Sequence, residues 1–221
     1  MTEPVLPPDF SRVKYLLFDH DGVLVDTEYW YFHATRTAIG ELGIDLSLER
    51  YRQHLVDGSS SWAPAHEAGI PEASIEAARL RRNDYYQTHL VTEDIEIDGV
   101  TEVLEELSKS YAMAIVTTAR PEDFTLIHEN RPILQFMNFV LAKGDYPRAK
   151  PKPDPYLTAM TRFNAQVAEC LVIEDSERGL RSAIAAGISC VTVHNDFTAH
   201  QSLTGATAKM SRLSELPGLL S

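Results

Sequence analysis

Apolar and polar positions along the chain follow two different periodicities. A short apolar run at 14–18 predicts a buried strand, and the long stretch after it, about 27–93, has helical spacing without a convincing strand. Beyond Gly99, helical stretches alternate with short apolar runs. Short apolar strands separated by helices are typical of a parallel sheet that is covered on both faces. The pattern therefore predicts an α/β fold whose sheet is interrupted, after its first strand, by an all-helical insertion.

The ranges of the predicted elements follow from the spacing of apolar residues and from glycine and proline. Helices are expected at about 27–42, 75–89, 100–107, 124–129, 154–163 and 180–186, and strands at 14–18, 112–116, 139–141, 170–173 and 190–193. Gly43 ends the first helix, and Gly58 with the serines after it interrupts the helical pattern. We therefore expect a core formed by residues 1–25 and 95–221 and a helical domain formed by residues 26–94.

Polar side chains stand where three of these strands end. The pairs are Asp19 and Asp21, Thr117 and Thr118, and Glu174 and Asp175. Ligands of an open parallel sheet bind beyond the carboxyl ends of its strands, so these groups are expected around one crevice. Alternate residues of an extended segment share a face, which lets Asp19 and Asp21 reach the same small volume, and Gly22 allows the chain to turn away.

Two carboxylates in one small volume require a cation. Aspartate oxygens suit a hard ion such as Mg²⁺, which keeps several waters and takes further ligands from a phosphate. Each group taken alone also has a simpler explanation. Asp-His-Asp-Gly is common in turns, Thr117 could satisfy a backbone group, and Asp175 could cap a helix. The order of all these groups along the chain is what favours a reaction site.

Four motifs resemble those of the haloacid dehalogenase-like (HAD) hydrolase superfamily, in its phosphatase and β-phosphoglucomutase-like branch with a helical cap. They read FDHDGVLVDTE, VTTA, AKPKPDPY and VIEDSERGLRSAIAAG and span about residues 14 to 190. The resemblance implies a Rossmann-like core and a helical cap that selects the substrate. It implies a Mg²⁺-dependent hydrolase of a small soluble phosphate ester, such as a sugar phosphate, acting through an aspartyl-phosphate. The alternative is a β-phosphoglucomutase-like hexose phosphomutase.

The resemblance also implies a role for each catalytic residue. Asp19 would be the nucleophile that attacks phosphorus, and Asp21 would protonate the leaving oxygen and then deprotonate water. Thr117, with backbone amides near Thr118, would hydrogen-bond the phosphoryl oxygens. Lys150 would neutralise the charge of those oxygens.

Further positions of the site follow from the same resemblance. The implied metal ligands are Asp19, the carbonyl of Asp21, Asp175 and, as a further candidate, Glu174. Gly22, Gly58 and Ser59 would lie against the substrate, the last two in a cap loop at 55–62 that faces the site. Lys152 shares the proline-rich loop of Lys150 and is an alternative to it.

The cap loop bears on the choice of substrate. Phosphomutases of the superfamily carry cationic side chains in this loop to hold a second phosphate, whereas Asp57 and serines stand here. A carboxylate near the pocket would repel a bisphosphate. We therefore expect a monophosphate with a neutral polyol tail, and the hydrolase is favoured over the phosphomutase.

Two residues depart from the usual pattern of the superfamily. His20 stands between the two aspartates, where an apolar residue is usual, and strand geometry predicts that its side chain points away from both into packed or hydrogen-bonded surroundings. Arg120 follows the second motif and is interpreted as a surface charge at a helix start rather than as a phosphate ligand.

Composition narrows the partners and the compartment. The net charge of -12 repels nucleic acid and anionic lipid surfaces. No apolar stretch approaches the ~20 residues of a membrane helix, and the start of the chain lacks the features of a signal peptide. Cys170 and Cys190 lie in apolar runs, which favours buried, reduced thiols and the cytoplasm. We expect a small phosphate ester as the partner, no nucleic acid or membrane, and a monomer or weak homodimer.

Two other functions are disfavoured. A non-catalytic regulator with the same fold would not need the nucleophile, the acid/base residue, the lysine and the metal ligands, all of which are present. A dehalogenase would leave Asp21 without an evident role, because cleavage of a carbon–halogen bond does not use a second aspartate.

Overall fold

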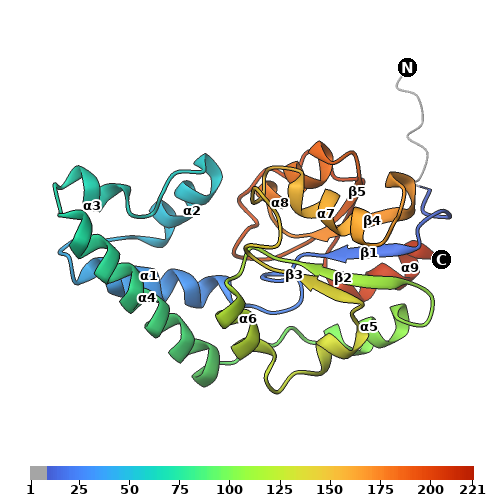
Figure 1. The fold of residues 1–221 in the computed structure, drawn as a ribbon, viewed down its shortest axis with the longest axis horizontal. Helices are drawn as coiled ribbons and strands as arrows, with labels where there is room; N and C mark the ends of the chain where they lie inside the picture. The colour runs from blue at the N-terminus through green and yellow to red at the C-terminus, as the bar shows by residue number, and fades with distance from the viewer. Residues whose placement is uncertain (1–8) are drawn as a thin grey trace.

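The computed structural model describes residues 9–221, so the first eight residues of the predicted core segment lie outside the described part. Within it, a six-stranded sheet has the strand order β3-β2-β1-β4-β5-β6 (Figure 1). Its strands are β1 (Tyr15–Phe18), β2 (Ala112–Val116), β3 (Phe139–Leu141), β4 (Cys170–Glu174), β5 (Ser189–Val193) and β6 (Ala208–Met210). All neighbouring strands pair in parallel. The predicted α/β fold with a Rossmann-like parallel sheet is therefore confirmed.

Helices cover both faces of the sheet, as Figure 1 shows. The core helices are α5 (Val100–Leu107), α6 (Pro121–His128), α7 (Asp154–Arg162), α8 (Glu177–Ala185) and α9 (Leu216–Leu220), with short 3₁₀ turns at Pro132–Phe136, Val167–Glu169 and Leu213–Glu215. Leu16 and Phe18 of β1 belong to the apolar cluster that contains buried residues of α5, α6 and α9. Leu17 belongs to the opposite cluster, with residues of α7 and α8. Alternate side chains of each strand thus pack into two apolar layers, one on each face of the sheet.

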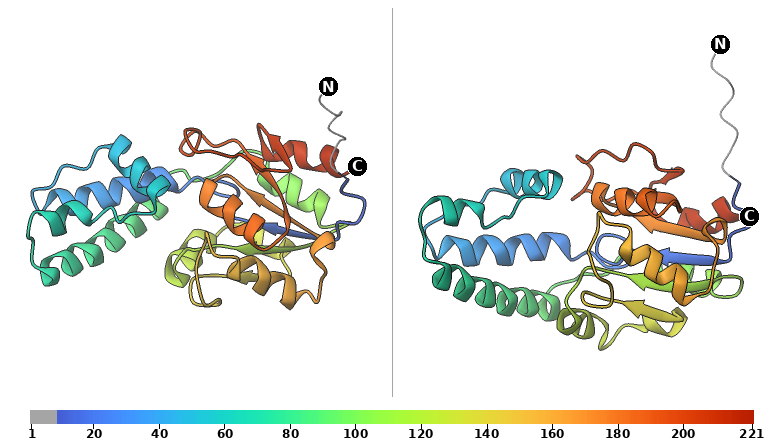
Figure 2. Two further views of the ribbon diagram at one scale, coloured as in Figure 1. Left: turned by 90° about the horizontal axis from the view of Figure 1, so that it is seen from above. Right: turned by 45° about the horizontal axis from the view of Figure 1, so that its top comes forward.

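Four helices occupy the stretch between β1 and α5. They are α1 (Glu28–Gly40), α2 (Leu48–Asp57), α3 (Ala63–Glu67) and α4 (Glu72–Thr92), and we call them the cap. Helices α1 and α4 lie alongside each other and extend away from the sheet (Figure 2). The cap has an apolar cluster of its own, which includes Phe32, Ile39 and Trp62. A separate apolar cluster supports the predicted division at residues 26–94, which stays a prediction. None of the described helices is both long and apolar enough to span a bilayer.

Helices α2 and α3 and strand β6 were not predicted from the sequence, because each is short or mostly polar. Helix α2 is amphipathic but mostly polar, and it fully buries only Tyr51; Ser47 caps it by accepting a hydrogen bond from the Arg50 amide at 3.2 Å. The short helix α3 also lies in the stretch without a predicted element. Strand β6 has three residues and pairs only with β5, at the edge of the sheet. Its sequence, Ala-Lys-Met, offers no apolar run, whereas β3, the three-residue strand at the other edge, reads Phe-Val-Leu and was predicted.

Candidate active site

The strand ends bring the predicted acidic groups together. The register of β1 and β4 pairs Phe18 with Ile173, and the Asp19 amide donates to the Ile173 carbonyl at 2.8 Å. The next residues along each strand therefore meet at the same edge of the sheet. Carboxylate oxygens of Asp19, Glu174 and Asp175 lie within 4.8 Å of one another. Residues from two distant parts of the chain thus form one acidic cluster.

Lys150 is the cation inside this cluster. Its Nζ donates to Asp19 Oδ1 and to Glu174 Oε1, both at 2.7 Å, and its side chain is only 2% exposed. Burial lowers the pKa of Lys150, but the charges of Asp19 and Glu174 outweigh it and hold that pKa above the usual range. Lys152 is exposed and has no side-chain partner among the described residues. The structure therefore places Lys150, not Lys152, at the acidic cluster.

Glu174 holds Lys150 in place. Besides Lys150, its Oε1 accepts from the Tyr156 hydroxyl at 2.7 Å, and its Oε2 accepts from the Ser176 hydroxyl at 3.0 Å. A Cβ at Gly179 would lie 1.7 Å from Glu174 Oε1, so only glycine leaves room for this carboxylate. Burial raises the pKa of Glu174, but Lys150 lowers it further and keeps the carboxylate ionised. The arrangement makes Glu174 a support for Lys150, and its role as a metal ligand stays a prediction.

The positive charge near Asp19 and Asp175 is too small to offset their burial. Burial, followed by the charge of Glu174, raises the pKa of Asp19 to about 7 and raises that of Asp175 as well. A divalent cation between these oxygens would reverse that effect, because it favours the ionised form of each ligand. Closely spaced carboxylate oxygens are also the ligands that Mg²⁺ prefers. The residues present therefore fit a hard divalent cation.

Gly22 makes the approach of Asp175 possible. Its φ is +83°, and a Cβ there would lie 2.3 Å from Asp175 Oδ2 and 3.0 Å from Asn195 Nδ2. The positive φ and the short distance both require glycine. Gly22 thus makes room for a candidate metal ligand, and the predicted contact with substrate stays untested.

Asn195 and Thr198 belong to the site and were not predicted. Asn195 Nδ2 donates to the Gly22 carbonyl at 3.2 Å, and Thr198 Oγ1 lies 3.1 Å from Asp175 Oδ2. Both follow the strand predicted at 190–193, at the same edge of the sheet. The rule that identified the other strand ends could have found them, had it been applied to this last strand.

Asp21 lies on the other side of Asp19 and is held by hydroxyl groups. Its Oδ1 accepts from Thr27 Oγ1, and its Oδ2 accepts from Thr117 Oγ1 at 3.3 Å. Burial raises the pKa of Asp21, but the charge of His20 and these hydrogen bonds outweigh it and lower the pKa to about 2. In this arrangement Asp21 is a carboxylate, the form that can accept a proton from water.

The prediction for His20 was half right. It is fully buried, and its Nε2 lies 2.9 Å from His128 Nε2, as expected of a packed and hydrogen-bonded histidine. Its Nδ1, however, lies 3.3 Å from Asp21 Oδ2, so the side chain does not point away from that aspartate. The reason is that β1 ends at Phe18, and the next residues fold into a turn in which the Leu24 amide bonds the His20 carbonyl at 2.8 Å. Strand alternation no longer holds there.

Thr117 serves the turn after β2 and the site together. Its hydroxyl accepts from the Ala119 amide at 2.9 Å and donates to Asp21. Its carbonyl accepts from the Tyr146 hydroxyl. Thr118 lies beside it, with its Oγ1 at 3.4 Å from Arg178 Nη2. Both interpretations of Thr117, a satisfied turn hydroxyl and a site residue, are therefore compatible with the structure.

A cavity of about 350 Å³ connects this site with the cap, and we call it the cap–core cavity. Asp21, Thr118 and Ala119 line it from the core. The cap contributes Glu28 and Tyr31 of α1, Tyr51 and Leu55 of α2, and Arg82 and Tyr86 of α4. A smaller adjoining cavity is lined by Asp19, Asp175 and again Leu55. The part of a substrate that leaves with the ester oxygen would thus lie between cap and core.

The predicted cap loop meets this cavity only through Leu55. Gly58 and Ser59 line neither of the two cavities, and Ser59 Oγ instead lies 2.7 Å from His54 Nδ1. Their predicted contact with substrate stays untested, and the structure does not bring them to the site. Asp57 accepts from Gln53 on the exposed side of α2 and also lines neither cavity. The expected repulsion of a second anion by Asp57 therefore loses its structural basis.

Cationic side chains line the cap–core cavity instead. Arg82, Lys143 and Arg178 all contribute to its wall, and none of them forms an ion pair with a carboxylate of the described residues. Arg120 also lines it, but two hydrogen bonds of 2.8 and 2.6 Å tie it to the buried Asp123. Arg120 stands at the start of α6, as predicted, but it is half-buried and held by a buried carboxylate rather than free at the surface.

Known proteins match this chain in sequence and in fold. The sequence profile of the family described as haloacid dehalogenase-like hydrolase matches residues 16–193. The chain belongs to this family, and its named relatives put it in the phosphatase branch.

Particular relatives share most of the chain's length. The N-acetylmuramic acid 6-phosphate phosphatase of Pseudomonas aeruginosa is 29% identical over 194 residues, which cover 84% of this chain and 84% of the relative. Protein CbbY of Cupriavidus necator is 27% identical over 217 residues, which cover 90% and 85%. The crystal structure of CbbY from Rhodobacter sphaeroides in complex with phosphate superposes with a TM-score of 0.77 at 21% identity, covering 92% of this chain and 96% of that one. At this identity the structure shows the fold alone.

Proposed function

We propose that the chain is a Mg²⁺-dependent phosphomonoester hydrolase that acts on a small soluble phosphate ester through an aspartyl-phosphate. The observation that carries the proposal is the position of Asp19. Lys150 bonds it at 2.7 Å on one side, Asp175 lies within the 4.8 Å acidic cluster, and Asp21 follows two residues later. A nucleophile, a cation for the phosphoryl charge, candidate metal ligands and an acid/base group thus surround one small volume.

The reaction would proceed in two displacements. In the first, an Asp19 carboxylate oxygen forms a bond to phosphorus and the ester P–O bond breaks, while Asp21, a carboxylate before substrate binds, passes to the leaving oxygen a proton that it takes up from solvent together with the substrate. In the second, Asp21 takes a proton from water, the water oxygen attacks phosphorus, and the bond to Asp19 breaks as phosphate leaves. Asp19, Asp175 and the Asp21 carbonyl would hold Mg²⁺, which would offset the negative charge of the transferring group.

The cap–core cavity supports a substrate whose leaving group carries a second anionic group. Its wall offers Arg82, Lys143 and Arg178, none of which forms an ion pair among the described residues, together with the cap carboxyl Glu28, whose pKa burial raises to about 7. A carboxylate or a second phosphate would satisfy these cations better than a neutral polyol. Among relatives, one acts on N-acetylmuramic acid 6-phosphate and another on fructose 1-phosphate, so the branch includes both acidic and neutral leaving groups.

The hexose phosphomutase stays the second candidate, because the same three cations could hold the second phosphate of a sugar bisphosphate. In that case the phosphoryl group returns to sugar instead of water. A solved structure described as a putative β-phosphoglucomutase from Thermotoga maritima shares the fold, with a TM-score of 0.71 at 23% identity. That likeness in fold does not distinguish a hydrolase from a phosphomutase. Measurement of released phosphate against sugar isomers does.

Paired substrates test the proposal. Phosphate release is measured with Mg²⁺ on glycerol 3-phosphate and on 3-phosphoglycerate, which differ in one hydroxymethyl or carboxylate group, and on hexose monophosphates with a parallel assay for isomers. We expect phosphate release that Asp19→Asn abolishes, and a lower KM for the acidic member of the pair. Arg178→Gln should raise that KM about tenfold and leave the neutral ester unchanged. Turnover of no ester, or isomer formation that outpaces phosphate release, would show the hydrolase proposal to be wrong.

We propose the cytoplasm as the compartment of the reaction, as the sequence predicts. Cys170 and Cys190 are buried and unpaired, which fits the proposed cytoplasmic location. Nucleic acid and membrane are not proposed as partners.

A further inference from the structure

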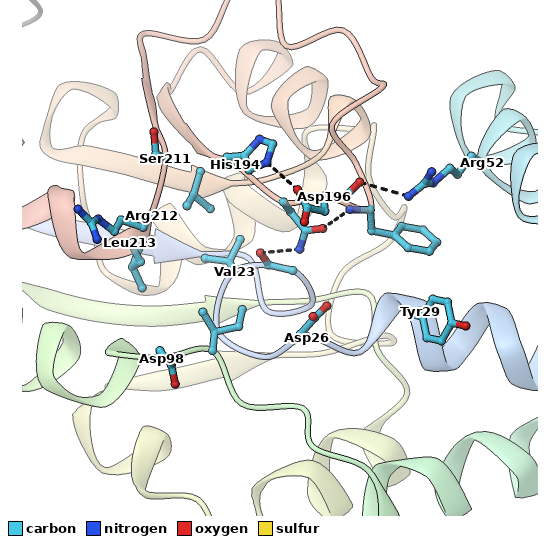
Figure 3. Close-up of a pocket in the computed structure, with 15 residues that line it drawn as sticks. Val23, Asp26, Tyr29, Arg52, Asp98, His194, Asp196, Ser211, Arg212 and Leu213 are labelled. Carbon is cyan, nitrogen blue, oxygen red and sulfur yellow. Dashed lines mark hydrogen bonds and ion pairs between the residues drawn. The ribbon is translucent and has the colours of Figure 1, made fainter.

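The loop after β5, residues 195–198, is in contact with the cap. Phe197 is 6% exposed and belongs to the apolar cluster of the cap, whose other buried members all come from residues 32–78. Arg52 of α2 holds the same loop, because its Nη2 donates to the Asp196 carbonyl at 3.2 Å and its guanidinium lies 5.1 Å from the centre of the Phe197 ring. Figure 3 shows Arg52 reaching from the cap towards Asp196.

The two ends of this loop, Asn195 and Thr198, are in contact with the acidic cluster and the turn beside it. Thr198, 4% exposed, places its Oγ1 3.1 Å from Asp175 Oδ2 and 3.0 Å from the Asp175 carbonyl. Asn195 Nδ2 donates to the carbonyl of Gly22, the residue that makes room for Asp175. The loop thus bonds both a candidate metal ligand and the turn beside it.

These two sets of contacts are separated by a single peptide bond. Phe197 and Thr198 are neighbours in the chain, so their Cα atoms are held about 3.8 Å apart. Inside the loop, the Phe197 amide donates to Asn195 Oδ1 at 2.7 Å, which ties the cap-facing residue to the Gly22-facing one. A displacement of Phe197 therefore has to move Thr198 or break this hydrogen bond.

The loop also has room to move. A cavity of about 380 Å³ lies beside it, away from Asp19 and Lys150, and is lined by Gly22, Asp26, Arg52 and residues 193–197 (Figure 3). The loop is therefore not packed against the core on that side. Its position depends on the bond of its middle to α2 and on the bonds of its two ends to Gly22 and Asp175.

We propose that Phe197 and Thr198 are positioning residues through which the contact between α2 and the core sets the orientation of Asp175 for the divalent cation. The inference rests on the proposed function, since it takes Asp175 as a metal ligand. Docking of the cap would strengthen cation binding through this loop. By thermodynamic reciprocity, the cation strengthens docking of the cap by the same factor.

The test measures Mg²⁺ binding by calorimetry, with the cation alone and no substrate. Arg52→Gln removes the bonds to the loop from the cap side, and Thr198→Val removes the hydroxyl that holds Asp175. We expect each to weaken Mg²⁺ binding about fivefold or more, the lower end of typical coupling between sites. Arg50→Gln is the matched control, because Arg50 is an exposed residue of the same helix whose side chain has no partner among the described residues, and it should bind Mg²⁺ as the wild type does.

Two further measurements separate coupling from general damage to the fold. If the two residues act in series, the double variant Arg52→Gln/Thr198→Val weakens Mg²⁺ binding no more than the stronger single variant does. Hydrogen exchange of α2 should slow on addition of Mg²⁺ in the wild type and in Arg50→Gln, but not in Thr198→Val. A merely structural role of Thr198 would leave the exchange of α2 responsive to Mg²⁺.

The outcomes distinguish this inference from the proposed function. If Arg52→Gln binds Mg²⁺ with wild-type affinity, or if the effects of the two single variants multiply in the double variant, the coupling is overturned. Phosphate release by the wild type would still support the proposed function in that case. Coupled Mg²⁺ binding without hydrolysis of any ester supports the loop and overturns the function. A wild type that binds no Mg²⁺ overturns both.

Discussion

Replacement of Lys150 by methionine tests the electrostatics of the site most directly. Lys150 is 2% exposed and bonds two carboxylates at 2.7 Å each, so Lys150→Met leaves Asp19 and Glu174 buried without their cation. Breaking a buried ion pair by removing one partner costs about 3–5 kcal/mol. A protein of this size shifts its melting temperature by about 2–4 °C per kcal/mol, so Lys150→Met should melt about 6–20 °C lower in the absence of metal.

The loss should depend on pH and on Mg²⁺ in a stated direction. The pKa of Lys150 in the folded protein is raised, so its stabilisation is fully present below its ordinary value of 10.5 and is lost only as pH rises beyond that value. Lys150 lowers the pKa of both Asp19 and Glu174, so in Lys150→Met both pKa values rise and the variant takes up more protons on folding than the wild type; it therefore gains stability relative to the wild type as pH falls from 8 to 5. Mg²⁺ at a hundred times its dissociation constant should restore about 2.7 kcal/mol.

Chemical denaturation at pH 5 and pH 8, each with Mg²⁺ and with chelator, measures all three effects. Lys152→Met is the matched control, because Lys152 is exposed in the same loop, and it should change stability by less than about 0.5 kcal/mol. Equal stability of Lys150→Met and Lys152→Met at pH 8 without metal would refute the view that Lys150 neutralises this cluster.

Two other expectations follow from the same geometry. Gly22→Ala should weaken Mg²⁺ binding and lower stability by more than Gly43→Ala does. Both glycines have a positive φ, but only at Gly22 would a Cβ lie 2.3 Å from Asp175. Calorimetry and chemical denaturation of the two variants measure the difference, and equal losses would contradict it. Addition of Mg²⁺ to chelator-treated wild type should raise its melting temperature, whereas Asp175→Asn should respond much less; an equal rise in both would exclude Asp175 as a ligand.

Much of the fold was predictable because local patterns and general packing rules agree. The strands at 112–116 and 139–141 and the helix at 100–107 have the predicted bounds, since each is a short apolar run or an amphipathic stretch next to glycine. Helix α2 was missed because it is mostly polar and buries little, and β6 because Ala-Lys-Met contains no apolar run. The pairs at the ends of β1, β2 and β4 were predictable because parallel strands end at one edge.

The partners of individual side chains were not predictable in the same way. His20 was expected to avoid Asp21, but the turn after Phe18 abolishes strand alternation. Asp57 was expected at the cavity because it lies in the cap loop, yet it lies on the exposed side of α2, while Arg82, Lys143 and Arg178 come from elements far apart in the chain. Side-chain direction depends on how elements pack, which local sequence does not encode.

The sequence by itself determined the family, the order of most strands and helices, and the residues that meet at the ends of β1, β2 and β4, because these depend on periodicity and on motifs read along the chain. Only the tertiary structure decided that Lys150 rather than Lys152 bonds Asp19, that Gly22 and Gly179 make room for carboxylates, and that one loop bonds both the cap and Asp175. The physical reason is that charge, burial and close approach are properties of distances between segments, and folding sets those distances.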